Sequence, residues 1–183
     1  MYNQPKHSSG FSLHELIITV AIAGILVGIA LPNFTSLVSD SRLTTISNDL
    51  VASLNLARSE AIKRGIEVAV RRKGANSGQW EFGWDVFADS DGNNIFNDNG
   101  DGNLCETGED CLLKTYDALP NNFTLRSGGN TDDYAAYIPN GLRKGLAADT
   151  FRLCHNSDVS ESRSIIINSI GRARVSSSAT SCP

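Results

Sequence analysis

The sequence is short of the residues from which catalytic and metal sites are usually built. Only three histidines occur, His7, His14 and His155, and they lie far apart in the chain. No phosphate loop is present, no nucleophile is arranged with a base, and neither a C-x-x-C motif nor a nearby pair of histidines suggests zinc. We therefore predict that the protein is not an enzyme, acts on no small-molecule substrate and requires no cofactor.

Positive charge is missing from one long stretch. Eight acidic residues and no Lys or Arg lie between Asp85 and Asp110, although the net charge of the whole chain is only -4. The rest of the sequence is therefore net positive. Because salt screens surface charges beyond roughly 8 to 10 Å, a basic patch can coexist with a negative total. Net charge alone excludes no partner.

Cysteine is sparse, and all of it lies in the second half of the chain. The four residues are Cys105, Cys111, Cys154 and Cys182. Sequential pairing, Cys105–Cys111 and Cys154–Cys182, is one of three possible connectivities, and it would place this part of the chain in an oxidising compartment. The alternative is a set of buried free thiols in a reduced protein.

The chain has little room for a second full domain. With 183 residues, of which 40% are hydrophobic, it can form one hydrophobic helix and one modest globular domain. One long apolar run begins at Phe11, FSLHELIITVAIAGILVGIALPNF. It continues for about twenty residues, as a bilayer requires, whereas the apolar region of an ordinary secretory signal spans about 7 to 15. We expect this run to stay in the product and to cross a membrane.

A single acid interrupts the apolar run. Glu15 stands five residues beyond Gly10, and an ionised carboxylate in hydrocarbon costs several kcal/mol unless it is paired. Cleavage between Gly10 and Phe11 would create an α-amine that the Glu15 of a neighbouring subunit can reach. The acid would then set the register between subunits.

The residues G-F-S-L-H-E-L, followed by the apolar run and Pro32-Asn33-Phe34, resemble the class III signal of type IV pilins and pseudopilins. The resemblance implies that a prepilin peptidase cleaves after Gly10 and methylates Phe11. It also implies a single-pass precursor in the bacterial inner membrane with its head in the periplasm, and later a pilus or pseudopilus, which can reach the cell surface. His14 departs from the usual aliphatic residue.

Three residues of the apolar run recur at every fourth position. Gly24, Gly28 and Pro32 therefore share one helical face, where another helix can approach closely. In filaments that the sequence resembles, the segment between such residues can instead lose helicity, which the missing donor of Pro32 would favour. Either interpretation gives these residues a part in assembly with other pilins.

The remaining sequence predicts an α+β fold in which a long helix packs on an antiparallel sheet. After Pro32, apolar residues recur at three and four residues up to Ala61, so the helix should end before Gly65. Eight segments with strand-like composition follow. They are Ile66–Arg72, Trp80–Ala88, Leu112–Ala118, Phe123–Leu125, Tyr134–Ile138, Thr150–Cys154, Ser164–Asn168 and Arg172–Ser176. This order excludes a parallel nucleotide-binding sheet.

Three further segments, Leu56–Ala61, Trp80–Gly92 and Gly171–Arg174, are together similar to the GspH/FimT/FimU group. The resemblance implies a type IV pilin-like fold and spans nearly the whole chain. The expected parts are a leader (1–10), a helix (11–64) with a membrane half (11–31) and an amphipathic half (33–64), and a β-rich head (65–183) with an insertion (89–110). The group includes minor pilins, DNA-receptor pilins and the H pseudopilin of type II secretion.

The insertion from Asp89 to Asp110 is rich in the oxygen ligands and turn residues of calcium sites. Asn97, Asn99 and Asp101 match positions one, three and five of an EF-hand loop, but position twelve falls on Gly108, and Glu109 comes one place late. The predicted ligands are Asp89, Asp91, Asn97, Asn99, Asp101 and Glu109. The alternative is a solvated loop closed by a disulfide.

The motif G-R-A-R from Gly171 to Arg174 should open the return strand of a terminal hairpin. Arg172 and Arg174 would then share a face about 7 Å apart, which suits neighbouring phosphates. In the FimT-type receptors that the sequence resembles, the matching motif binds DNA. Candidates to extend the patch are Arg163, Arg143 and Lys144. The alternative is that arginines on an edge strand serve only solubility.

These observations predict a FimT/FimU-type minor pilin that helps pilus initiation or occupies the tip, with non-specific DNA binding for natural transformation as a candidate activity. The rival from the same resemblance is a pseudopilin of type II secretion. A third alternative, disfavoured by Glu15 and the cleavage signal, is a membrane-anchored binding module that never polymerises.

Overall fold

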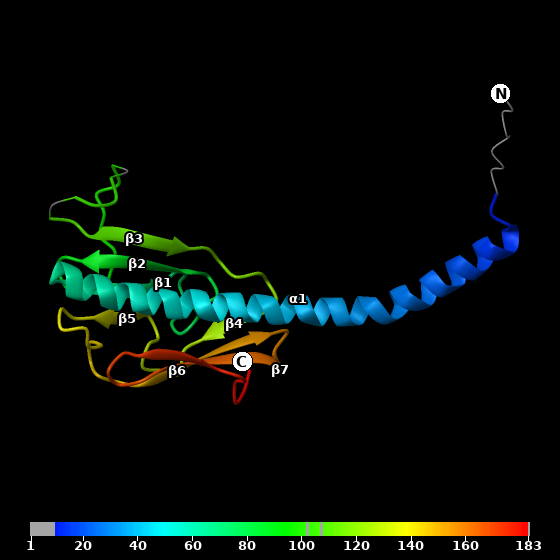
Figure 1. Ribbon diagram of the computed structural model, residues 1–183. Helices are drawn as coiled ribbons and strands as arrows, with labels where there is room; N and C mark the ends of the chain where they lie inside the picture. The colour runs from blue at the N-terminus through cyan, green and yellow to red at the C-terminus, as the bar shows by residue number, and fades with distance from the viewer. Residues whose placement is uncertain (1–9, 102, 107, 183) are drawn as a thin grey trace, which may run out of the picture. The chain divides into compact units, whose positions relative to one another are not determined.

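The computed structural model describes residues 10–101, 103–106 and 108–182, and the side chains of residues 29–34 lie outside this description (Figure 1). Residues 1–9 of the predicted leader are outside it as well. One helix, α1 (Leu13–Arg64), precedes eight strands. They are β1 (Glu67–Arg72), β2 (Trp84–Asp89), β3 (Cys111–Tyr116), β4 (Phe123–Arg126), β5 (Tyr134–Tyr137), β6 (Asp149–His155), β7 (Asp158–Ile167) and β8 (Ala173–Ser176).

The strands form two antiparallel four-stranded sheets rather than one. Their orders are β3-β2-β1-β5 and β4-β6-β7-β8. In Figure 1 the C-terminal part of α1 runs across both sheets, with β3 and β2 above it and β6 and β7 below. The predicted α+β class, a long helix on antiparallel sheet, is confirmed.

Both ends of α1 follow from local sequence. At the start, the Ser12 hydroxyl accepts a hydrogen bond from the Glu15 amide at 3.3 Å, and the Glu15 carboxylate accepts one from the Ser12 amide at 3.0 Å. This reciprocal pair is a capping box. At the other end, Gly65 has φ +70° and its amide bonds the Ala61 carbonyl at 3.0 Å, so the helix ends where the sequence predicted.

The chain divides into two compact units, residues 1–39 and residues 40–183. In the first unit most of the described apolar side chains are exposed, for example Val20 at 64% and Ile25 at 65%. Within the described part of the chain, no helix combines the length and the apolar composition that a membrane crossing requires.

The core of the second unit lies between α1 and the two sheets. From α1 it receives a stripe of completely buried side chains that includes Leu50, Leu54 and Ala57. Burying each leucine contributes roughly 1.5 to 3 kcal/mol. Two tryptophans are fixed in this core by hydrogen bonds, because Trp84 Nε1 donates to Ser53 Oγ at 2.8 Å and Trp80 Nε1 donates to the carbonyl of Thr131 at 3.1 Å.

All eight predicted strands occur, with two clear differences in length. β2 begins at Trp84 rather than at Trp80, because Gly83 has φ +90° and its amide bonds the Trp80 carbonyl at 3.1 Å in a turn. β7 begins at Asp158, six residues before the predicted start. Both disulfides of the sequential pairing, Cys105–Cys111 and Cys154–Cys182, are present.

Candidate functional site

The G-R-A-R motif lies in the turn between β7 and β8 and at the start of β8. The turn is closed by three hydrogen bonds: the Gly171 amide to the Asn168 carbonyl (2.9 Å), the Arg172 amide to Asn168 Oδ1 (2.8 Å), and the Asn168 amide to the Arg172 carbonyl (3.0 Å). Gly171 has φ +83°, a conformation that other residues adopt at a cost. The predicted terminal hairpin is therefore present.

The turn is attached to the other sheet through a buried tyrosine. Tyr137, the last residue of β5, donates a hydrogen bond from its hydroxyl to the carbonyl of Gly171 at 2.7 Å. Burial raises the pKa of Tyr137 to about 12, so the hydroxyl keeps its proton at ordinary pH. A Cβ at Gly171 would lie 2.5 Å from Tyr137 Cε1. Only glycine fits this contact without displacement.

Arg172 and Arg174 are both exposed. Arg174 lies on the edge strand β8, and Arg172 directly precedes that strand, where its carbonyl accepts a hydrogen bond from the Asn168 amide, so the two residues share a face. Neither guanidinium makes a hydrogen bond or an ion pair with a described residue. Two free planar donors thus project from one edge of the sheet, an arrangement suited to a polyanion.

The residues predicted to extend this patch have other partners. Arg143 is only 3% exposed and donates to the carbonyls of Asn130 and Ala147, so its assignment to the patch is wrong. Burial also lowers the pKa of the Arg143 guanidinium. Lys144 bonds Glu67 Oε1 at 2.8 Å.

Arg163 also fails to join the patch. On β7 it lies two residues before the buried Ile165, so it is on the same, inner side of the strand, and it forms an ion pair with Asp40 of α1. It therefore points toward the helix, away from the face that carries Arg174, whose cross-strand partner is Ile166. The prediction for Arg163 is wrong for this reason.

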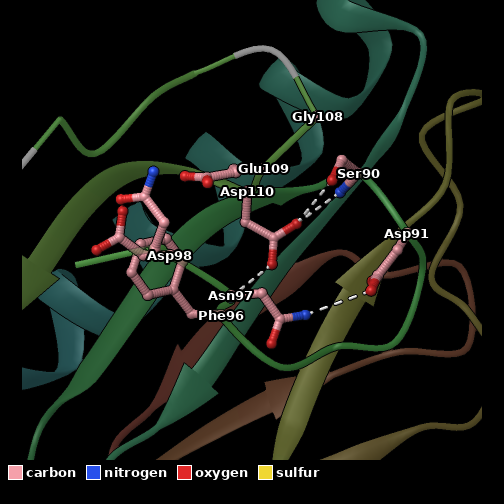
Figure 2. A pocket seen from close by; sticks show the side chains of 9 residues that line it. Ser90, Asp91, Phe96, Asn97, Asp98, Gly108, Glu109 and Asp110 are labelled. Carbon is pink, nitrogen blue, oxygen red and sulfur yellow. Dashed lines mark hydrogen bonds between the residues drawn. The ribbon is translucent and has the colours of Figure 1, made fainter. Parts of the chain in front are cut away.

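The acidic insertion gathers three carboxylates. One oxygen from each of Asp89, Asp91 and Asp110 can lie within 4.8 Å of the others. Figure 2 shows Asp110 directed toward Ser90, and a pocket of about 290 Å³ opens beside these side chains. Oxygen ligands of this kind suit a hard cation, so the donor set is chemically compatible with calcium.

Much of the hydrogen-bonding capacity of this cluster is already used by the loop itself. The Asp89 carboxylate accepts from the amides of Gly92 (2.7 Å) and Asn94 (2.7 Å), and the Asp110 carboxylate accepts from the amides of Ser90 (2.8 Å) and Asn97 (2.8 Å). Burial raises the pKa of the Asp89 carboxyl, and the neighbouring acids add to the rise.

The cluster differs from the predicted ligand set. The carboxylates of Asp101 and Glu109 are not in it, and the Asp101 amide donates to Asn99 Oδ1 across a local turn. No described helix flanks the loop, as helices do in an EF-hand. Asp110 was missed, although the pairing of Ala88 with Cys111 places it directly beside Asp89. Calcium binding stays a prediction.

At the N-terminal end, the predicted processing and assembly residues lie on open surface. Phe11 is 84% exposed, and a Cβ added at Gly24 or Gly28 would meet no atom within 4 Å. The backbone of α1 continues through Pro32, whose side chain lies outside the described set. Ser12 donates hydrogen bonds to the Glu15 carboxylate from both its amide and its hydroxyl. This residue was missed in the sequence, although the S-x-x-E spacing is the signature of a capping box.

Comparison with known proteins agrees with this architecture. The GspH model, described as a type II transport protein, matches residues 47–171, and the model of the prokaryotic N-terminal methylation motif matches residues 5–31. The type IV major alpha-pilin of Moraxella bovis is 49% identical over 43 residues, which are 24% of this chain. The match spans only 27% of that pilin.

Two crystal structures of the Pseudomonas aeruginosa type IV minor pilin FimU have the same fold. Their TM-scores are 0.60 and 0.58 at 18% and 19% sequence identity, and the matches cover 78% and 77% of this chain and 96% and 100% of FimU. The methylation motif implies processing by a prepilin peptidase and assembly with other pilins. With its family model matched over more than half of its length, the chain belongs to the type IV pilin-like GspH/FimT/FimU family, whose members are structural subunits.

Proposed function

We propose that this protein is a minor pilin of a type IV pilus, active in initiation or at the tip, whose head binds DNA without reading its sequence. The fold likeness to FimU supports the pilus assignment. The observation that carries the DNA assignment is the pair Arg172 and Arg174, exposed and without partners among the described residues on one face of an edge strand.

Assembly follows from a change of partner at Glu15. In the uncleaved chain, the Ser12 amide and hydroxyl both donate to Glu15 Oε2 at 3.0 Å. Cleavage after Gly10 frees a positive α-amine on Phe11, and the Glu15 of an adjoining protomer pairs with it when both enter an apolar environment. The exposed apolar side chains of residues 11–28 then pack against neighbouring subunits.

The proposed route places the precursor in the inner membrane as a single-pass protein with its head in the periplasm. The two disulfides agree with an oxidising compartment. After cleavage, the subunit leaves the membrane as part of the filament and can reach the cell surface.

The DNA contact is electrostatic. Two guanidinium groups about 7 Å apart each offer paired donors to a phosphate, and binding releases counterions. The logarithm of affinity should therefore fall with the logarithm of salt concentration with a slope of about -2 to -4, and different sequences of equal length should bind equally.

The test is DNA retention by the full chain in detergent micelles. The double variant Arg172→Ala, Arg174→Ala should lose binding. A matched control, Arg42→Ala with Lys63→Ala, removes the same charge from exposed positions on α1 and should keep it. Equal retention by the Arg172, Arg174 variant and the wild type would contradict the assignment.

A second candidate is a pseudopilin of type II secretion, because the matching family model is described as a type II transport protein. Gene deletion separates the candidates. Loss of piliation or twitching indicates an initiator, loss of DNA uptake with pili intact indicates a receptor, and periplasmic retention of secreted proteins indicates a pseudopilin. A chain that never enters filaments would instead be a membrane-anchored binding module.

A further inference from the structure

The outer face of the second sheet, which carries Arg174, also carries a third arginine, Arg152. Cross-strand pairing places Thr150, Ile166 and Arg174 in one row, and Arg152, Ser164 and Ser176 in the next row. Residues paired across strands project from the same face. Phe151 and Leu153, the chain neighbours of Arg152, are completely buried in the core, so Arg152 projects outward from β6.

A groove of about 500 Å³ with both polar and apolar surface lies on this face. Its lining includes Thr150, Arg152, Ser164, Ser176, Ser178 and Thr180. The described lining residues include no acid and no aromatic side chain. Among the described lining residues, Arg152 is therefore the charged one, and it stands beside several hydroxyl groups that can donate hydrogen bonds to an anion.

We infer that this groove continues the DNA-binding surface and that Arg152 is a third phosphate-binding residue, so that the preferred ligand is the backbone of duplex DNA. This inference rests on the proposed DNA binding by Arg172 and Arg174 and extends it from the sheet edge onto the sheet face. Two strand spacings and two residues along the strand separate Arg152 from Arg174, about 12 Å between backbones. The two long side chains can therefore reach different phosphates of one duplex.

The absence of aromatic side chains from the groove decides between duplex and single strand. Proteins that prefer single strands stack bases on aromatic rings, at about 1 to 3 kcal/mol per base. On this sheet the nearby rings of Phe123 and Phe151 are buried in the core instead. The groove can hold phosphates by charge and hydroxyl donors, which a duplex supplies at higher density than a single strand.

Arg126 looks like a fourth member of this surface, but it is not. It stands opposite Arg152 in the pairing of β4 with β6, and its guanidinium forms an ion pair with Glu81. Its charge is therefore already balanced. By contrast, the only hydrogen bond of the Arg152 side chain within the described residues runs from Nη1 to Ser181 Oγ at 3.0 Å, which leaves its charge uncompensated.

The test measures binding of a fluorescent 20-base-pair duplex, and of one of its strands alone, to the full chain in detergent micelles over a range of salt. Arg152→Gln should weaken duplex binding by about tenfold at low salt and make the salt slope shallower by about 1. The wild type should bind the duplex at least as tightly as the strand. Ser181→Ala, which removes the hydrogen-bond partner that Arg152 has among the described residues without changing charge, should leave both values unchanged.

The outcomes separate this inference from the function on which it rests. If Arg152→Gln binds the duplex as the wild type does while the Arg172, Arg174 variant fails, the groove assignment is wrong and the hairpin assignment stands. Preference for the single strand would also overturn the groove assignment. If the wild type binds neither probe, both assignments fall. A melting temperature equal to that of the wild type shows that Arg152→Gln is folded.

Discussion

The hydroxyl of Tyr137 donates a 2.7 Å hydrogen bond to the carbonyl of Gly171 and so links the two sheets of the head. Tyr137 ends β5 of one sheet, and Gly171 forms the turn between β7 and β8 of the other. Because this turn leads directly into Arg172, the contact fixes the position of the backbone from which Arg172 and Arg174 project. The glycine of the motif is thus needed for packing as well as for turning the backbone.

Removing this hydroxyl should destabilise the head. In Tyr137→Phe the buried carbonyl of Gly171 loses its donor, at a cost of about 1 to 3 kcal/mol. Urea unfolding of the full chain measures the change. Tyr134→Phe, in the same strand but 37% exposed, is the matched control and should change stability little. Equal stability of the Tyr137 variant and the wild type would show that the bond contributes nothing.

Adding one methyl group at Gly171 should cost more than adding it at another glycine with the same backbone. Gly171→Ala places a carbon 2.5 Å from Tyr137, whereas Gly145, with φ +80°, has no atom within 4 Å of an added Cβ. Gly145→Ala should therefore show only the backbone cost, about 1 kcal/mol, and Gly171→Ala at least about twice that. Thermal unfolding of both variants makes the comparison, and equal losses would contradict it.

Strand-like composition and the turn residues between the segments located the strands, but they could not group them into sheets. The division into two sheets depends on non-local pairing, for example of β1 with β5 across more than sixty residues, for which the sequence carries no local signal. The end of α1 was predictable because Gly65 gives a local signal.

Local sequence signals likewise predicted only part of the candidate site. Arg172 and Arg174 were placed correctly because they follow a short apolar strand and alternate. Arg143 was misplaced because burial of an arginine depends on carbonyl groups from Asn130 and Ala147, which no local pattern reveals. Arg152 was missed, although its position between Phe151 and Leu153 indicates an outward residue on a strand.

The two disulfides should contribute unequally to stability. Cys154–Cys182 closes a loop of 28 residues and Cys105–Cys111 a loop of 6. Loop entropy gives about 3.5 kcal/mol for the first and about 2 kcal/mol for the second. Urea unfolding of the two Cys→Ala double variants should show the larger loss for the pair Cys154 and Cys182, and the reverse order would contradict this reasoning.

Calcium is tested most directly through the melting temperature. If the three carboxylates bind the ion, millimolar calcium should raise the melting temperature of the wild type, and Asp91→Asn should remove the rise. Because the pKa of Asp89 is raised, protonation competes at a higher pH than for an ordinary aspartate, and the rise should shrink as the pH falls. No calcium-dependent shift would contradict the prediction from the sequence.

The proposed assembly depends on a new amine at Phe11 beside the acid at Glu15, and mass spectrometry of the protein recovered from cells tests this proposal most directly. We expect the mature chain to begin with N-methylated Phe11, and we expect Glu15→Gln to be cleaved but absent from sheared filaments. A mature chain that still begins at Met1, or normal incorporation of the glutamine variant, would contradict the account.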